Sequence, residues 1–214
     1  VEKHFSNHKM KKKKNRLFLF CWALGIARSA PTSQFAQKNK NDSLNLTRTT
    51  RKSVQHLLEK YKLQMGNIHL EDHSYHLRDL PLLSTDFNNW FQMTDWTRLH
   101  GALGDIQTYW SMLGWKRKQL EQERDVQMDP SLLQSIRHVQ HDLCDLMKKV
   151  NSEMRGIKSS WVKPAPCVEL QNLGRSSRTL WESRVEGYII LRDLHLYLTK
   201  LARDFLLLAS KSHS

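Results

Sequence analysis

The last long segment of the chain constrains its fold most. Six apolar residues recur there at alternating spacings of three and four, which places them on one face of an α-helix: Leu191, Leu194, Leu198, Leu201, Phe205 and Leu208. Five charged residues lie behind this stripe: Arg192, Asp193, Lys200, Arg203 and Asp204. No proline interrupts 176–210, so we predict one helix of roughly eight to ten turns at ~3.6 residues per turn. Such a helix must bury its apolar face against other long helices.

The first part of the chain has the composition of a secretory signal peptide. Met10 is followed by a basic stretch, by an apolar stretch at 17–27 and by small residues. We expect residues 1–30 to comprise a leader, 1–9, and the signal peptide, and the remainder to be secreted and extracellular. About 11 apolar residues are too few for the ~20 of a spanning helix, so we expect no membrane insertion after signal removal. An uncleaved anchor is the alternative. Three cleavage positions are possible, after Ala27, Ser29 or Ala30.

The net charge of +13 is unevenly distributed. Residues 1–27 contain seven basic residues and one acidic residue, so they contribute +6 and the rest of the chain carries +7. The remaining Lys and Arg are scattered among acidic residues rather than lined on one face, which is not typical of a nucleic-acid-binding surface. We expect no nucleic-acid partner. A secreted, basic, heparin-binding helical protein without receptor signalling is the alternative function.

Three earlier segments have the apolar period of amphipathic helices. They are 44–65, a segment that begins at Thr94 or Asp95 and ends before 121–128, and a segment that begins at Asp129. Their expected buried faces are Leu44, Thr47, Val54, Leu58, Tyr61 and Met65; Trp96, Leu99, Leu103, Ile106, Trp110, Leu113 and Leu120; and Leu132, Ile136, Val139, Leu143, Leu146, Val150, Met154 and Ile157.

The starts of these helices carry capping residues. Asp129 followed by Pro130 is the clearest start, since proline suits the first helical position. Asn41, Asp42 and Ser43 are candidate caps of the first helix, after a flexible segment at 31–43.

The connections between the four helices predict how they are ordered. The links at 66–93 and 161–175 are long, whereas 121–128 is short. A long link can return along the whole bundle, so we expect an all-α, long-chain four-helix bundle at 44–210, with up-up-down-down order and two long crossover loops.

The sequence lacks the motifs of an active site. No glutamate is followed by histidine at the third place, which argues against a di-iron bundle, and no Gly-x-Ser-x-Gly, Walker or dinucleotide motif occurs. Two histidine groups, His138 with His141 and His69 with His73 and His76, are weak metal candidates that we interpret as ordinary polar residues. We therefore expect no catalysis, metal or cofactor.

Secretion changes how cysteines and asparagines are interpreted. Once Cys21 leaves with the signal, Cys144 and Cys167 can pair, stay as free thiols or form an intermolecular bridge. Asn41 and Asn45 begin N-glycosylation sequons, so we expect a glycoprotein.

Two segments resemble the ciliary neurotrophic factor branch of the interleukin-6-type cytokines. The segment entering the second helix contains Ser84-Thr85-Asp86, Trp90, Thr94, Arg98-Leu99 and Gln107-Thr108-Tyr109, and the start of the last helix contains Trp181-Glu182-Ser183-Arg184. These resemble the family's Ser-Thr-Asp, Trp, Thr, Arg-Leu, Gln-x-Tyr and Phe-x-x-Lys series. The signal peptide favours its secreted relatives, such as cardiotrophin-like cytokine or a fish form.

The resemblance implies a monomeric, neurotrophic type of cytokine with growth factor activity. Its partners would be class I cytokine receptor ectodomains, namely the leukaemia inhibitory factor receptor and the shared signal-transducing chain, and its output JAK/STAT signalling. By position, the receptor-binding residues would be Trp181 and Arg184, together with Trp90. Trp and Arg here replace Phe and Lys, which leaves the choice of receptor open.

Two expectations about exposure follow. Trp181 lies seven residues before Tyr188, so it could instead be a core residue, whereas Arg184 is hard to bury unpaired. A second receptor face is expected on the first and third helices: Arg51, Lys52, Gln55, Gln140 and Lys148.

Overall fold

The computed structural model describes residues 30–66, 76–83, 86–122, 129–162 and 179–211. The chain divides into two units, Val1–Lys38 and Asn39–Ser214, and all contacts below lie within the second. The expected leader and signal peptide lie outside the described residues.

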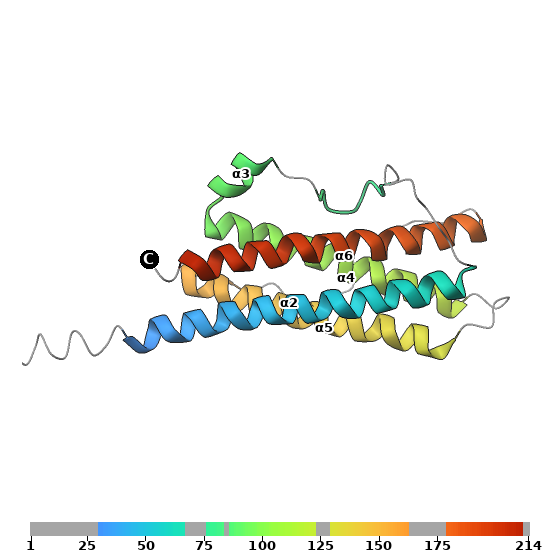
Figure 1. The fold of residues 1–214 in the computed structure, drawn as a ribbon, viewed down its shortest axis with the longest axis horizontal. Coiled ribbons are helices and arrows are strands. Elements are labelled where there is room, and N and C mark those ends of the chain that lie inside the picture. Colours follow the sequence, from blue (N-terminus) through green and yellow to red (C-terminus); the bar gives the residue numbers. More distant parts are fainter. Residues whose placement is uncertain (1–29, 67–75, 84–85, 123–128, 163–178, 212–214) are drawn as a thin grey trace, which may run out of the picture. The chain divides into compact units, whose positions relative to one another are not determined.

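Four long helices pack as a bundle in the second unit, which confirms the all-α prediction (Figure 1). Together with one short helix, the elements are α2 (Ala30–Gln64), α3 (Phe87–Gln92), α4 (Asp95–Gln122), α5 (Pro130–Ile157) and α6 (Leu180–Ser210).

The predicted apolar faces form the core. All six stripe residues of α6 are buried, as is every predicted core residue of α5 except Ile157. Ile157 is 50% exposed because it is the last residue of α5, so its assignment to the core was wrong. Trp96 and Trp110 of α4 are only partly buried and pack against the edge of the core.

Hydrogen bonds show how neighbouring helices run. Between α2 and α6, Lys40 Nζ donates to the Leu208 carbonyl at 3.0 Å and the Tyr61 hydroxyl donates to the Arg184 carbonyl at 3.2 Å. Residue numbers therefore rise along one helix as they fall along the other, and the two helices are antiparallel. Three other helix pairs are antiparallel for the same reason. α2 and α5 are joined by Ser43 with Glu153 and by Lys60 with Ser135. α4 is joined to α5 by Trp110 with Gln140 and Glu121 with Arg137, and to α6 by Arg98 with Asp204 and Lys116 with Ser183.

The helix starts partly confirm the predicted caps. Asp129 accepts from the Ser131 amide at 2.8 Å and Pro130 is the first residue of α5, as predicted. The Thr94 hydroxyl oxygen accepts from the Thr97 amide at 3.1 Å at the start of α4.

The first helix begins earlier than predicted. α2 starts at Ala30 rather than Leu44, so the expected flexible segment at 31–43 is helical. Pro31 lies in the first turn, where a helix needs no amide donor. The Ser43 hydroxyl contacts the Glu153 carboxylate rather than capping a helix.

A short helix interrupts the long connection that was expected to lack one. α3 is capped by Asp86, whose carboxylate accepts from the Asn89 amide at 3.1 Å. Its six residues are too few to carry a recognisable apolar period.

Three of the five charged residues expected behind the α6 stripe, Arg192, Asp193 and Asp204, are buried instead, whereas Arg203 is exposed and Lys200 is partly buried. Asp193 is 1% exposed and accepts from Arg192 Nε at 2.8 Å, while Asp204 pairs with Arg98 Nη1 at 2.5 Å. These ion pairs therefore allow other parts of the protein to cover more sides of α6 than its apolar stripe alone predicts.

Candidate functional site

The first turn of α6 is sharply defined. The Thr179 hydroxyl oxygen accepts from the Glu182 amide at 3.1 Å, and the Glu182 carboxylate accepts from the Thr179 amide at 3.0 Å. This reciprocal pair is a capping box, which fixes where the helix begins.

The same turn presents a large aromatic side chain to solvent. Trp181 is 60% exposed, so it is not a core residue despite its spacing from Tyr188. Arg184, one turn later, is partly buried, and its Nε makes no hydrogen bond with the described residues. The expected pair is thus an exposed indole beside a half-buried guanidinium.

Two side chains from other helices hold this end of α6. The buried Lys116 of α4 donates from Nζ to both the carbonyl and the hydroxyl oxygen of Ser183 at 2.6 Å, and to Gln119 Oε1 at 2.8 Å. The Tyr61 hydroxyl of α2 donates to the Arg184 carbonyl. The backbone behind Trp181 is therefore fixed from two sides.

Further exposed apolar side chains lie in the elements that meet at this end of the bundle. Leu180 precedes Trp181 and is 46% exposed, and Leu63, near the end of α2, is 73% exposed. Lys62 Nζ lies 5.3 Å from the ring centroid of Tyr188, so this last turn of α2 contacts the third turn of α6. Sequence reasoning missed Leu63 because it falls outside the apolar period of α2. We call Leu180, Trp181 and Arg184 the indole surface.

Trp90 lies far from the indole surface. Its Nε1 donates to Asp204 Oδ1 at 2.6 Å, near the other end of α6. Residues 181 and 204 are separated by roughly 35 Å at ~1.5 Å per residue. The structure therefore does not bring Trp90 together with Trp181 and Arg184, and Trp90 cannot share one contact with them.

Trp90 instead anchors α3 to the bundle. The Arg98 guanidinium lies 4.9 Å from the Trp90 ring centroid, donates to the Trp90 carbonyl and forms the ion pair with Asp204. Arg98 and Asp204, two charged residues of the kind usually found at a protein surface, are thus buried and attach α3 to the bundle through Trp90.

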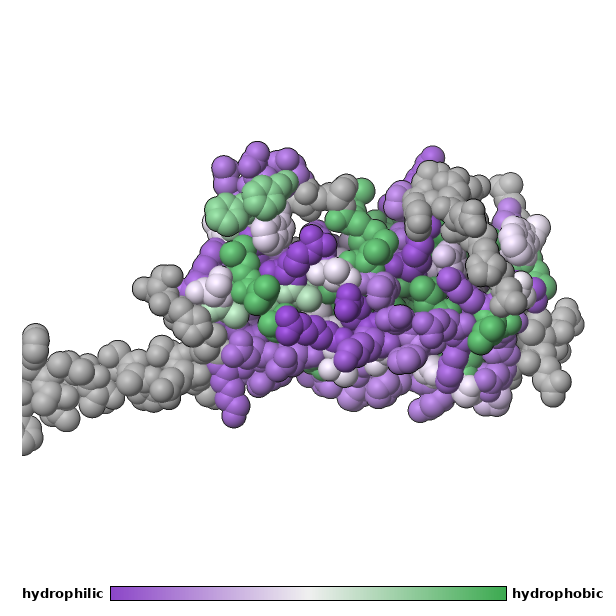
Figure 2. Space-filling view, viewed as in Figure 1, coloured by the Kyte–Doolittle hydropathy of each residue, from purple (hydrophilic) through white to green (hydrophobic). Residues whose placement is uncertain are grey.

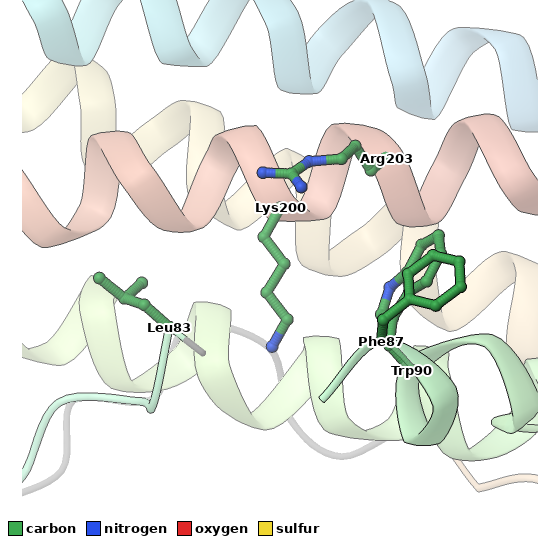
Figure 3. Close-up of a pocket in the computed structure, with 5 residues that line it drawn as sticks. All are labelled: Leu83, Phe87, Trp90, Lys200 and Arg203. Carbon is green, nitrogen blue, oxygen red and sulfur yellow. The ribbon is translucent and has the colours of Figure 1, made fainter. Parts of the chain in front are cut away.

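A pocket of about 430 Å³ lies beside this attachment (Figure 3). Leu83, Phe87 and Trp90 give it apolar walls, and Lys200 and Arg203 of α6 give it two cations. In Figure 3 Lys200 extends between Leu83 and the two aromatic rings. Such a lining suits an anionic group attached to an apolar body.

An exposed apolar area covers α3 above the pocket, seen as the hydrophobic patch over α3 in Figure 2. Phe87 and Phe91 are 68% and 59% exposed, and their ring centroids stack 6.1 Å apart. Sequence reasoning missed this area because it assigned no helix there.

The expected second receptor face is only partly exposed. Lys52 and Gln55 are exposed, as is Lys148, which pairs with Asp145 at 2.7 Å. Arg51 donates to Thr199 of α6 at 3.4 Å, so it lies against α6. Gln140 is buried, accepts from Arg117 and donates to the Trp110 carbonyl, so its expected exposure was wrong. Its side-chain amide, on α5, forms hydrogen bonds with two residues of α4.

The two sequons and one cysteine lie in described helices. Asn41 and Asn45 are exposed on α2. Cys144 of α5 is disulfide-bonded. Cys167 lies outside the described residues, so its pairing with Cys144 stays a prediction.

The histidine groups are engaged elsewhere. Among the described residues no three His, Cys, Asp or Glu side chains are arranged to hold a metal. His76 Nδ1 lies 3.5 Å from Asp193, and His138 and His141 lie near Asp142 and Asp145. His69 and His73 fall outside the described residues.

The fold and these surfaces define an all-helical protein built on four long helices packed as a bundle. A scan against protein-family models found no match, and a search of curated proteins found none either. Within the described ranges, no helix has both the length and the apolar composition required to cross a membrane.

Proposed function

We propose that the protein is a secreted helical cytokine of the interleukin-6 type, which brings class I cytokine receptor chains together. The leukaemia inhibitory factor receptor and the shared signal-transducing chain are the proposed partners, and JAK/STAT signalling the proposed output. The observation that carries the proposal is the exposure of Trp181 on a turn fixed by Lys116 and Tyr61.

The physics of binding supports this choice of surface. Tryptophan and arginine are favoured hot-spot residues in protein interfaces, and a rigidly held side chain loses less freedom on binding. Leu180, the residue before the indole, supplies further exposed apolar area. The indole surface thus has an aromatic anchor, an apolar neighbour and one cation, and it needs no catalytic group.

The proposed bundle order is up-up-down-down, as in long-chain cytokines. It is supported by the hydrogen bonds in which α5 and α6 each run antiparallel to both α2 and α4. In that order the start of the last helix lies at the end of the bundle, where a receptor can reach it.

Further parts of the proposal concern residues around this core. A signal peptide within 1–30 directs secretion, Asn41 and Asn45 carry glycans, and Cys144 pairs with Cys167. A second receptor chain contacts Lys52, Gln55 and Lys148, which are exposed. The mature protein acts as a monomer.

The test is binding of the secreted protein to a panel of class I receptor ectodomains. Trp181→Ala should weaken binding to the leukaemia inhibitory factor receptor by about 30-fold or more, equivalent to the ~2 kcal/mol of a hot spot. Combining it with Arg184→Ala should abolish binding, while far-UV circular dichroism and melting stay unchanged.

Phe91→Ala is the matched control, because Phe91 is an aromatic residue of nearly the same exposure on α3. It should leave binding to this receptor unchanged. Failure of the original protein to bind any ectodomain, or full binding by the Trp181 variant, would refute the proposal.

A further inference from the structure

A line of basic side chains follows the junction of α2 and α6. Arg48 and Lys52 of α2 and Arg203 of α6 are exposed, and Arg51 is partly buried between the two helices. We call these four residues the basic strip. Arg203 also lines the pocket beside α3, so the strip reaches that pocket.

Contacts between α2 and α6 place Arg48, Arg51 and Arg203 near one another, and Lys52 lies one helical turn from Arg48 on α2. Arg51 Nη1 lies 3.4 Å from Thr199 Oγ1, and Lys40 Nζ lies 3.0 Å from the Leu208 carbonyl. Arg48 is one turn from Arg51 in the direction of Lys40. Because the helices are antiparallel, Arg48 is level with the α6 turn that follows Thr199, and that turn carries Arg203.

The guanidinium of Arg51 on α2 affects a histidine of α6 across the junction. Burial, together with the nearby Arg51 guanidinium, lowers the pKa of His195 on α6. His195 therefore adds little positive charge at neutral pH, and the strip depends on its Arg and Lys residues.

Acidic residues are missing from this junction. α2 has no Asp or Glu between Asp42 and Glu59, and α6 has only Asp204 after Asp193. Asp204 is buried and already paired with Arg98. Within the described part of the chain, none of the four strip residues forms an ion pair. The strip is thus four cations without local neutralisation.

The surroundings of the strip favour one kind of polyanion. Exposed Phe87 lines the pocket that the strip reaches at Arg203, but none of the exposed aromatic side chains in the described residues belongs to α2, which carries the other three cations, so most of the strip offers no platform for stacking bases. Leu196 and Leu206 of α6 are 45% and 53% exposed, but they lie ten residues apart and do not form the continuous apolar face with which an amphipathic helix enters a lipid surface. A chain of regularly spaced sulfates requires neither stacking nor apolar burial.

We propose that the basic strip, Arg48, Arg51, Lys52 and Arg203, binds a sulfated polysaccharide. The site is separate from the indole surface but shares Lys52 with the proposed second receptor face, so the heparin experiment below uses no receptor. Sequence reasoning found the Lys and Arg residues scattered, but packing of the first helix against the last gathers these four along one junction.

The experiment compares two triple variants of the full chain with equal loss of charge. The strip variant is Arg48→Gln, Arg51→Gln and Arg203→Gln. The control is Arg137→Gln, Lys148→Gln and Arg155→Gln, three exposed cations of α5. The two variants are identical at all other positions, so every other basic residue contributes equally to binding in each protein.

Affinity for heparin is measured by titration at several salt concentrations. We expect the strip variant to bind at least tenfold more weakly at ~0.15 M salt, and its slope of log affinity against log salt to fall by about two, at ~0.7 per neutralised anion of a flexible strand. The control should keep most of its affinity. Desulfated heparin, a single-stranded oligonucleotide and vesicles containing phosphatidylserine should bind the original protein more weakly than heparin.

Several results would overturn the proposal. They are equal losses in the two variants, no loss in the strip variant, or equal binding of heparin and the other polyanions. Circular dichroism checks folding, and Arg48→Gln with Lys52→Gln and Arg203→Gln provides a second strip variant that keeps the contact of Arg51 with Thr199.

Discussion

Side chains of two other helices lie against the backbone of the last helix at Gly187, and replacing this residue with alanine tests the packing directly. A Cβ atom at this position would meet the Tyr61 hydroxyl oxygen at 2.1 Å and Lys116 Cε at 2.7 Å. Both distances are far inside van der Waals contact. Both neighbours are also bonded to the backbone of α6, so neither can move without losing a hydrogen bond.

The magnitude can be worked out from these contacts. In an unobstructed helix, glycine to alanine stabilises by about 1 kcal/mol. Here overpacking costs about 1–3 kcal/mol. Displacing Tyr61 and Lys116 weakens one neutral hydrogen bond, worth about 1 kcal/mol, and one to a charged group, worth about 1.5–3 kcal/mol. We expect Gly187→Ala to lower the free energy of unfolding by about 2–6 kcal/mol, the upper value applying if both hydrogen bonds are lost.

Urea unfolding followed by far-UV circular dichroism measures the change. Gly101→Ala and Gly104→Ala on α4 are matched controls, because an added Cβ meets nothing within 4 Å at either position. They should stabilise the protein. Adding Tyr61→Leu to Gly187→Ala should cost less than the sum of the two single changes. A Gly187 variant as stable as the controls would refute the packing described here.

Two further predictions concern buried charges. Asp204→Asn should lower the free energy of unfolding by about 3–5 kcal/mol, because it leaves the buried Arg98 without its charged partner. Urea unfolding measures this, and Asp145→Asn, at a partly exposed ion pair, should cost less than about 1 kcal/mol. Burial raises the pKa of Glu153 above its ordinary 4.5, so the folded state holds the proton more tightly and stability should fall as pH rises from about 4.5 through the raised pKa. Glu153→Gln should flatten this fall in unfolding measured from pH 4.5 to 8, whereas Glu59→Gln should not, and an unchanged slope in the Glu153 variant would contradict the assignment.

The parts of the fold that could be predicted from the sequence are those that apolar periodicity and helix caps determine. Leucine spacing along 191–208 and the Asp129-Pro130 start both describe local backbone requirements, and the structure agrees with both. The predicted start of α2 was wrong because a polar segment that contains a proline is typical of a linker, although proline is also acceptable in the first turn of a helix.

Charged core residues could not be predicted in the same way. Lys116, Arg98 and Asp204 look like solvent-facing residues in sequence, and their burial depends on partners that are distant along the chain. Trp181 was correctly singled out as a candidate for exposure, but no periodicity could separate that choice from a core role. The separation of Trp90 from Trp181 required the positions of α3 and α6.

The attachment of α3 imposes an order on biosynthesis. Asp204 lies 114 residues after Trp90 and 106 after Arg98. During translation, therefore, the middle of the polypeptide leaves the ribosome long before the carboxylate that fastens it exists. A nascent chain arrested before residue 204 would have three helices available but would keep Arg98 hydrated and α3 undocked. The last turns of α6 thus complete the attachment of a segment that was synthesised much earlier.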